Sequence, residues 1–119
     1  MKQILIIPGR LPGYNQLNGK CWAGRYRIKK SEMEKVMWCA KAAGVWPVTD
    51  RVRITIRCYE QNGRRDADNV ISGANKIVLD ALQKLRIIQG DGQKHVEPGY
   101  STVTVDRKNP RVEVEIEEV

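Results

Sequence analysis

The chain has 119 residues, enough for one modest hydrophobic core and too few for two independent ones. Its 41% hydrophobic and 29% charged residues are typical of a folded globular protein and exclude a disordered chain. Lysine and arginine outnumber aspartate and glutamate by 21 to 14, which gives a net charge of +7 and an isoelectric point near 9.5. A single domain spanning residues 1–119, with a polyanion as its natural partner, is therefore expected.

The distribution of charge and cysteine narrows the class of protein further. Residues 1–65 carry 14 basic and 4 acidic side chains, a net +10, whereas residues 66–119 carry 7 and 10, a net −3. Basic residues also keep surfaces soluble, so this charge does not by itself identify a nucleic acid. The three cysteines form no C-x-x-C pair, and no apolar run suits a signal peptide or membrane span. We expect a cytoplasmic protein.

The first predicted element is a buried strand over residues 3–7, an apolar run that ends at Pro8 and Gly9. Residues 9–30 follow as a predicted loop, and loops of this length are usually functional or mobile. The loop mixes rings with cations, as a surface that grasps a DNA strand would: Tyr14, Trp22 and Tyr26 with Lys20, Arg25, Arg27, Lys29 and Lys30. A disordered basic loop accounts for the same residues equally well.

A capping-box pattern at Ser31 and Glu34 predicts the start of the first helix, which ends at Gly44. A half-buried strand is predicted next, over residues 51–59, because apolar and polar side chains alternate there. The polar face of this strand carries Arg51, Arg53 and Arg57. These arginines suit either a DNA backbone or acidic groups of the same protein.

The second predicted helix covers residues 69–85, where an apolar stripe persists over four turns. The stripe consists of Val70, Ile71, Ala74, Ile77, Val78, Ala81, Leu82 and Leu85. Asn109 and Pro110 then divide two alternating runs, residues 101–106 and 111–117, which predicts a hairpin. The order strand, helix, strand, helix, strand, strand indicates an α+β domain with two helices on a four-stranded, mostly antiparallel or mixed sheet.

Two carboxylates at the start of the second predicted helix are the sharpest chemical feature. Asp66 and Asp68 follow Arg64 and Arg65, and hard divalent ions such as Mg²⁺ bind carboxylate oxygens while keeping several waters. Asp91, between two glycines, is a possible third ligand. Aspartate also caps helices and occupies turns, so both the metal site and these structural roles remain open.

Lys76 and the two arginines extend this candidate site. In phosphodiester hydrolysis a lysine neutralises charge that builds on the phosphate, and Arg64 and Arg65 would hold the DNA backbone. Lys76 lies four residues before Asp80 on the polar side of the helix, so an ordinary ion pair is an equally good interpretation.

Several of these motifs occur together, in order, in one known family. The sequence resembles the RusA family of Holliday-junction resolvases, common in prophages, over most of its length. The resemblance is carried by the segments 65–69, 76–82 and 91–93 (RDADN, KIVLDAL and DGQ), together with Pro12-Gly13-Tyr14-Asn15, which is similar to the family's N-terminal loop.

The resemblance implies a homodimer that makes paired, symmetric nicks in four-way DNA junctions with Mg²⁺, for which Mn²⁺ can substitute. A metal-activated water would attack the phosphodiester. Asp66, Asp68 and Asp91 match the family's metal-binding catalytic aspartates, Lys76 matches its catalytic-site lysine, and Asn15 is assigned to DNA binding. Two features depart from the family pattern: Lys76 lies about one helical turn further from Asp68, and Gly90 replaces a frequent acidic residue. The alternative is a basic nucleic-acid-binding module of the same fold that does not cleave.

Overall fold

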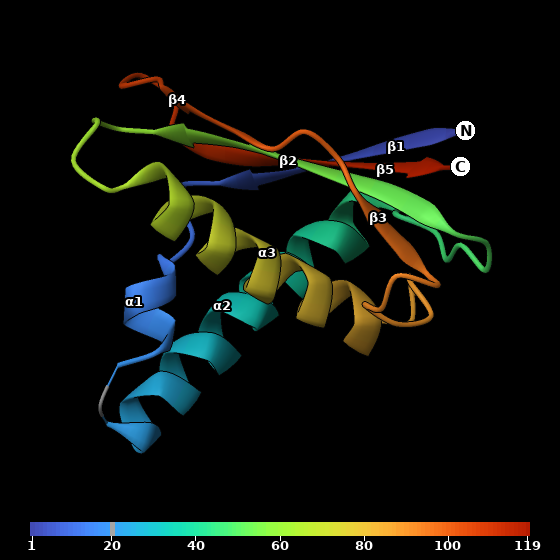
Figure 1. Ribbon diagram of the computed structural model, residues 1–119, viewed down its shortest axis with the longest axis horizontal. Coiled ribbons are helices and arrows are strands. Elements are labelled where there is room, and N and C mark those ends of the chain that lie inside the picture. Colours follow the sequence, from blue (N-terminus) through green and yellow to red (C-terminus); the bar gives the residue numbers. More distant parts are fainter. Residues whose placement is uncertain (20) are drawn as a thin grey trace.

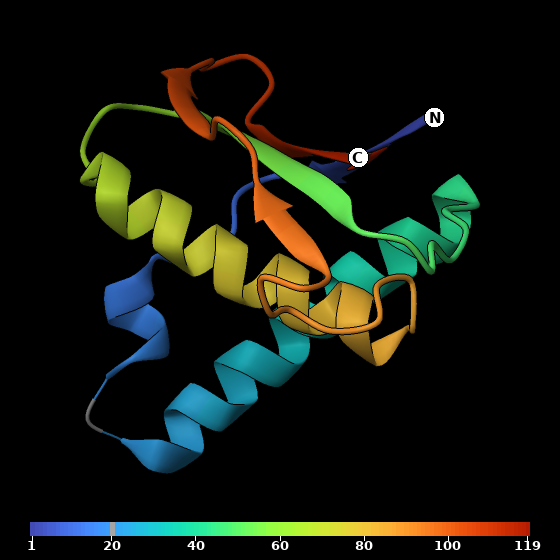
Figure 2. The ribbon, with the colours of Figure 1, turned by 45° about the vertical axis from the view of Figure 1, so that its right-hand side comes forward.

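The computed structural model describes residues 1–19 and 21–119, and arranges them as one sheet with helices on a single face (Figure 1). Figure 2 shows the same two layers from another side. The elements in chain order are β1 (Lys2–Pro8), α1 (Tyr14–Leu17), α2 (Trp22–Ala43), β2 (Val52–Glu60), α3 (Ala67–Lys84), β3 (Val96–Pro98), β4 (Thr102–Val105) and β5 (Arg111–Glu118). The predicted α+β class is confirmed, with one helix and one strand more than expected.

The sheet is mixed and has β2 at its centre. Its order is β1-β5-β2-β3, and β4 also pairs with β2. β5 runs antiparallel to both β1 and β2, whereas β3 and β4 run parallel to successive parts of β2. Gly99 lies between β3 and β4, so close to β2 that a Cβ there would collide with the side chain of Thr55. β3 and β4 therefore act as one interrupted strand.

The core lies between the sheet and α3. Alternate residues of β1, β2 and β5 are buried, and the stripe predicted on α3 faces them. The largest fully buried side chains include Leu5, Ile7, Ile56, Ile77, Leu82 and Ile116. Burying each such aliphatic side chain stabilises the fold by about 1.5–3 kcal/mol, so this seam fixes α3 against the strands.

Two predictions about local structure were wrong. The hairpin does not form: β4 and β5 both pair with β2, on its opposite sides. Alternation predicts a strand but not its neighbour, which depends here on the long-range contact at Gly99. The segment 9–30 is also not a continuous loop, because it contains α1 and the first turns of α2.

The first helix begins earlier than its sequence pattern indicated. α2 starts at Trp22, and the expected capping box at Ser31 and Glu34 lies inside it; its end at Gly44, in a left-handed conformation, is as predicted. Only Val36 and Ala40 of this helix are buried. The first turns extend beyond the core, so they carry no buried apolar stripe by which periodicity could reveal them. In the described part of the chain, no helix is long and apolar enough to cross a membrane.

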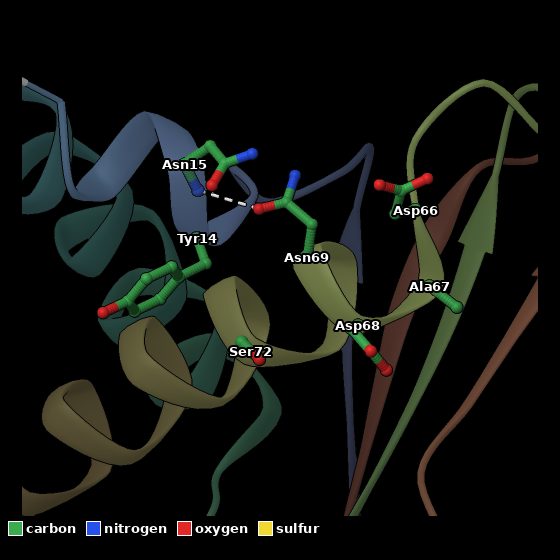
Figure 3. A pocket seen from close by; sticks show the side chains of 7 residues that line it. All are labelled: Tyr14, Asn15, Asp66, Ala67, Asp68, Asn69 and Ser72. Atoms are coloured by element: carbon green, nitrogen blue, oxygen red, sulfur yellow. Dashed lines mark hydrogen bonds between the residues drawn. The ribbon is translucent and has the colours of Figure 1, made fainter.

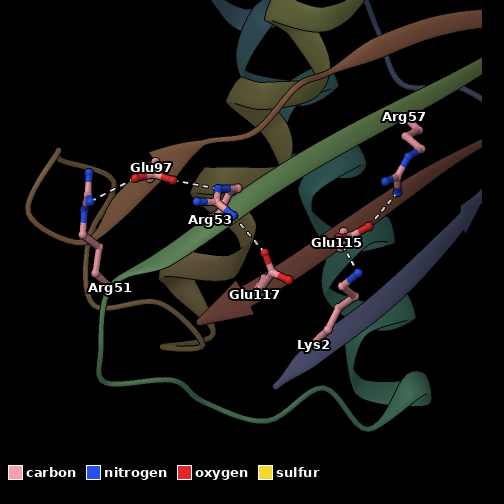
Figure 4. Close-up of polar contacts among 7 residues, drawn as sticks. All are labelled: Lys2, Arg51, Arg53, Arg57, Glu97, Glu115 and Glu117. Carbon is pink, nitrogen blue, oxygen red and sulfur yellow. Dashed lines mark hydrogen bonds and ion pairs between the residues drawn. The ribbon is translucent and has the colours of Figure 1, made fainter. Parts of the chain in front are cut away.

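The arginines of β2 pair with acidic groups of the same protein, which decides between the two interpretations of that face (Figure 4). Arg53 donates to Glu97 at 2.7 Å and to Glu117 at 3.0 Å. Arg57 and Lys2 both contact Glu115, at 2.9 Å and 3.1 Å. The full set comprises Lys2, Arg51, Arg53 and Arg57 with Glu97, Glu115 and Glu117.

These contacts change the acidity of the glutamates. The hydrogen bond from Arg53 holds the pKa of Glu97 below its ordinary value, and those from Lys2 and Arg57 lower the pKa of Glu115. A group whose pKa is lower in the folded state contributes stability that is complete above its unfolded pKa. That contribution is lost as the pH falls through the folded pKa.

We predict that the free energy of unfolding falls as the pH drops below about 4.3, the ordinary pKa of glutamate. Urea unfolding between about pH 7 and about pH 3 measures this slope. Glu115→Gln should give a shallower slope than the wild type, because glutamine does not titrate. Identical slopes for the two proteins would contradict a role for these ion pairs in the acid response.

Candidate functional site

Asp66 and Asp68 lie at the start of α3, where the loop after β2 turns into the helix. Asp66 is the N-cap residue in an extended conformation, yet its side chain makes no capping hydrogen bond. Asp68 lies in the first turn, and both residues are exposed. Within residues 1–19 and 21–119 neither carboxylate has an ion-pair partner. The capping interpretation therefore leaves the carboxylate of Asp66 unexplained.

The two aspartates line a hollow of about 490 Å³ together with side chains from α1 (Figure 3). We call it the acidic hollow; it is lined by Tyr14, Asn15, Asp66, Ala67, Asp68, Asn69 and Ser72. The backbone N–H of Asn15 donates to Oδ1 of Asn69 at 2.8 Å, which joins α1 to the first turn of α3. In Figure 3 the side chains of Asp66 and Asp68 point in different directions from the helix start.

The segment before α1 packs tightly against α3. A Cβ at Gly73 would collide with the carbonyl oxygen of Pro12 and come within 2.8 Å of the Cα of Gly13. A Cβ at Gly13 would in turn collide with the side-chain amide of Asn69. The two glycines thus allow the backbone of residues 12–13 to lie directly on the helix, which brings Tyr14 and Asn15 beside the aspartates.

Arg65 also links the segment before α1 to the chain just ahead of α3. Its guanidinium donates to both carboxylate oxygens of Glu60, each at 2.8 Å, and to the carbonyl oxygen of Leu11 at 2.9 Å. The side chains of Arg65 and Glu60 are only 16% and 4% exposed.

Burial, and then the nearby Glu60 carboxylate, raise the pKa of the Cys58 thiol to about 11, so this thiol is not a nucleophile at neutral pH.

A second hollow, of about 320 Å³, adjoins the first and contains Asp91 and Lys76. We call it the lysine hollow; its lining includes Tyr14, Ser72, Asn75, Lys76, Asp80 and Asp91. Tyr14 and Ser72 line both hollows, so the two lie next to each other on either side of these residues. Lys76 contacts Asp80 at 3.3 Å, the ion pair considered from the sequence, and Lys29 of α2 contacts the same carboxylate at 2.8 Å.

The three aspartates lie along one side of α3 but do not form one cluster. Among residues 1–19 and 21–119, no three acidic, histidine or cysteine side chains are close enough to hold a metal ion together. Asp66 and Asp68 share the acidic hollow, whereas Asp91 lies in the lysine hollow. Mg²⁺ is commonly held by one or two carboxylates and completed by water and substrate phosphate, so the exposed carboxylates of Asp66 and Asp68 are ligands of the kind that such an ion takes, while their side chains point apart in this structure.

The residues predicted to bind DNA fall into three groups. Asn15 lies in the acidic hollow, and Arg64 is exposed just before it. Arg25, Lys29 and Lys30 line hollows along α2, where Arg27 is also exposed. Arg65 is engaged inside the protein by Glu60, and Lys20 lies outside the described residues.

Tyr14 and Ser72 line both hollows; sequence reasoning named Tyr14 only as a ring of the 9–30 loop and did not select Ser72. Ser72 follows Asp68 by four residues, a spacing that puts both on the same helix face. Tyr14 directly precedes Asn15 in the segment used for the family resemblance. Helical spacing was therefore a usable signal for Ser72, whereas the contact of Tyr14 with α3 depends on the close packing at Gly73.

We predict that Glu60→Ala lowers the free energy of unfolding by about 3 kcal/mol, because it leaves the partly buried Arg65 without its counter-charge. Urea unfolding measures the loss. The matched control is Glu97→Ala, which removes a glutamate that is 30% exposed from its arginine partners and should change stability much less. Equal losses in the two variants would contradict a structural role for the pair of Arg65 and Glu60.

Two comparisons, with protein-family models and with curated proteins, find no match to the chain. A function for the chain has to be inferred from the side chains of the two hollows and from the charge around them.

Proposed function

We propose that this chain is a cytoplasmic, metal-dependent DNA endonuclease of the RusA resolvase type that nicks four-way junctions. One observation carries the proposal: Asp66 and Asp68 share a hollow with Tyr14 and Asn15. The hydrogen bond from Asn15 to Asn69 joins residues that are 54 positions apart in the sequence. The segments that carry the resemblance thus meet at one place. Lys76 and Asp91, the remaining residues it selects, line the adjoining hollow.

The acidic pair suits a divalent ion that arrives with a phosphate. Asp66 and Asp68 would hold Mg²⁺, or Mn²⁺ in its place, through carboxylate oxygens that form no ion pair with other described residues. When bound, such an ion polarises a phosphoryl oxygen and lowers the pKa of a coordinated water. The hydrogen bond that the backbone N–H of Asn15 donates to Oδ1 of Asn69 keeps α1 beside the two aspartates and fixes that wall of the hollow.

The lysine hollow places an ammonium group next to the acidic hollow. Lys29 and Lys76 both contact Asp80, so one carboxylate orients two ammonium groups, and with Asp91 in the same hollow these four charges cancel. A phosphate in the lysine hollow would be met by the ammonium of Lys76. Asp91 adds a carboxylate to the same hollow and is positioned to orient a water or a second ion.

The charge that attracts a polyanion lies mainly on the helical face. α2 carries six basic and two acidic side chains, a net +4. The arginines of β2, by contrast, are paired with glutamates of the same sheet. DNA would therefore approach across the helices, the side on which both hollows open, and its binding would weaken steeply with salt.

An exposed strand at the edge of the sheet supports the homodimer in this proposal. β1 pairs only with β5 among the described strands, so its other edge is open. Ile4 and Ile6 on β1 are 55% and 53% exposed, although natural edge strands usually avoid outward apolar side chains. A second copy, added by strand pairing, would satisfy the free backbone groups at the edge of β1, extend the apolar surface at Ile4 and Ile6 across the sheet, and present two equivalent sites to a two-fold junction.

The decisive test is a synthetic four-way junction incubated with the protein, with and without Mg²⁺. We predict symmetric paired nicks in the junction and none in a matched linear duplex. Asp68→Asn should lower the rate of cleavage by about a hundredfold or more, because the neutral amide is a poor Mg²⁺ ligand. Junction affinity of this variant should persist, since phosphate contacts come from the basic residues.

The matched control for this variant is Asp50→Asn, an exposed aspartate in the connection between α2 and β2. It carries the same chemical change away from both hollows and should nick at the wild-type rate. Junction binding without nicking by the wild-type protein would favour the alternative, a basic binding module of the same fold. Nicking that survives Asp68→Asn would rule out the acidic hollow as the cleavage site.

A further inference from the structure

Two aromatic rings lie stacked on the surface at the start of α2. The ring centroids of Trp22 and Tyr26 are 5.8 Å apart and their planes differ by 14°. Trp22 is 71% exposed and Tyr26 is 55% exposed. The two residues are four apart on the helix, and such a side-chain pair adds only a little to the stability of the helix. That contact leaves most of the ring surface in water, where a flat apolar ligand can cover it.

Cations surround the rings. A hollow of about 330 Å³, which we call the aromatic hollow, is lined by Leu17, Trp22, Arg25, Tyr26 and Lys29. The ammonium of Lys29 is held at 2.8 Å from Asp80, on the side facing α3. Rings flanked by guanidinium and ammonium groups match a nucleotide, because bases stack on rings while phosphates meet cations.

The aromatic hollow is connected to the acidic hollow by a chain of shared side chains. The lysine hollow shares Asp80 with a further hollow beside Gln83 and Lys84, which in turn shares Lys29 with the aromatic hollow. We call this row of neighbouring hollows the trough. Its part along α3, from Asp68 to Asp80, rises by about 18 Å, a length that about five stacked nucleotides of one strand cover at about 3.4 Å each.

We propose that Trp22 and Tyr26 form a stacking platform for unpaired bases of a DNA strand whose backbone follows this trough into the acidic hollow. The inference rests on the proposed function, because the acidic hollow supplies the direction of the strand. Duplex DNA does not fit this role, since its bases are already covered by their stacked neighbours. Arg25 and Lys29 would contact phosphates on either side of the rings.

Binding of two short probes, without divalent ions, tests the platform. The probes are a dye-labelled oligothymidylate of about ten nucleotides, long enough to span the trough, and a strand of equal length that carries abasic sites but the same phosphates. Stacking on a ring contributes a few- to about 150-fold in affinity per base, so Trp22→Ala should weaken oligothymidylate binding by about five- to 150-fold. Binding of the abasic strand should change little.

Two control variants separate stacking from loss of structure. Trp22→Phe keeps a ring at the position and should recover most of the affinity for oligothymidylate. Trp38→Ala removes another exposed tryptophan of α2, 74% exposed and outside the aromatic hollow, and should leave both affinities unchanged. Circular dichroism of each variant checks that α2 remains folded.

The platform would be overturned if wild-type protein bound both probes equally, or if Trp22→Ala weakened both alike. A change in oligomeric state without any change in probe preference would overturn it too, and would assign the rings to a protein contact. The outcome is independent of cleavage: a preference for bases with no nicking leaves the platform standing and removes the nuclease. Nicking without a preference for bases would keep the nuclease and remove the platform.

Discussion

Arg65 lies where three segments of the chain meet, and its guanidinium connects them. It joins Glu60 at the end of β2 to the backbone of Leu11 and lies one residue before Asp66. A partly buried guanidinium is tolerable only with its charge and hydrogen bonds satisfied, so these contacts fix the relative position of the segments. The loop that carries Asp66 and the segment that leads into α1 are thereby held side by side, which is the condition for the acidic hollow.

The two faces of the molecule use their charge differently. On the open face of the sheet, arginines and glutamates neutralise one another across β2, β3 and β5. On the helical face, the cations of α2 exceed its acids, and the carboxylates of Asp66 and Asp68 form an acidic site beside them. Under the proposed function, a polyanion bound to the cations would bring its phosphates toward carboxylate oxygens of the kind that divalent ions take.

Much of the fold follows from the sequence, and the exceptions have physical causes. The stripe of α3 and the alternation of β2 each place a large apolar face, so their periodicity predicted them correctly. The early start of α2 left no periodic pattern, because its first turns extend beyond the core. The two strands of the predicted hairpin do form, but their pairing with β2 depends on the close approach at Gly99, which alternation does not reveal. At the site, the sequence predicted that three aspartates gather around one ion, whereas the structure places Asp66 and Asp68 in one hollow and Asp91 in the next. Arg65 was assigned to DNA from its charge, although the alternation of β2 continues to Glu60 and places this carboxylate on the buried face, where it needs a partner.

The central claim is that Asp66 and Asp68 bind a divalent ion, and Mn²⁺ titration of the amide resonances tests it most directly. Mn²⁺ broadens the signals of nuclei close to it. The account predicts that broadening begins at residues 66–69 and at Tyr14 and Asn15 across the hollow, and that Asp68→Asn abolishes it there. First broadening at the glutamates of β5, or no site-specific broadening at all, would contradict the account.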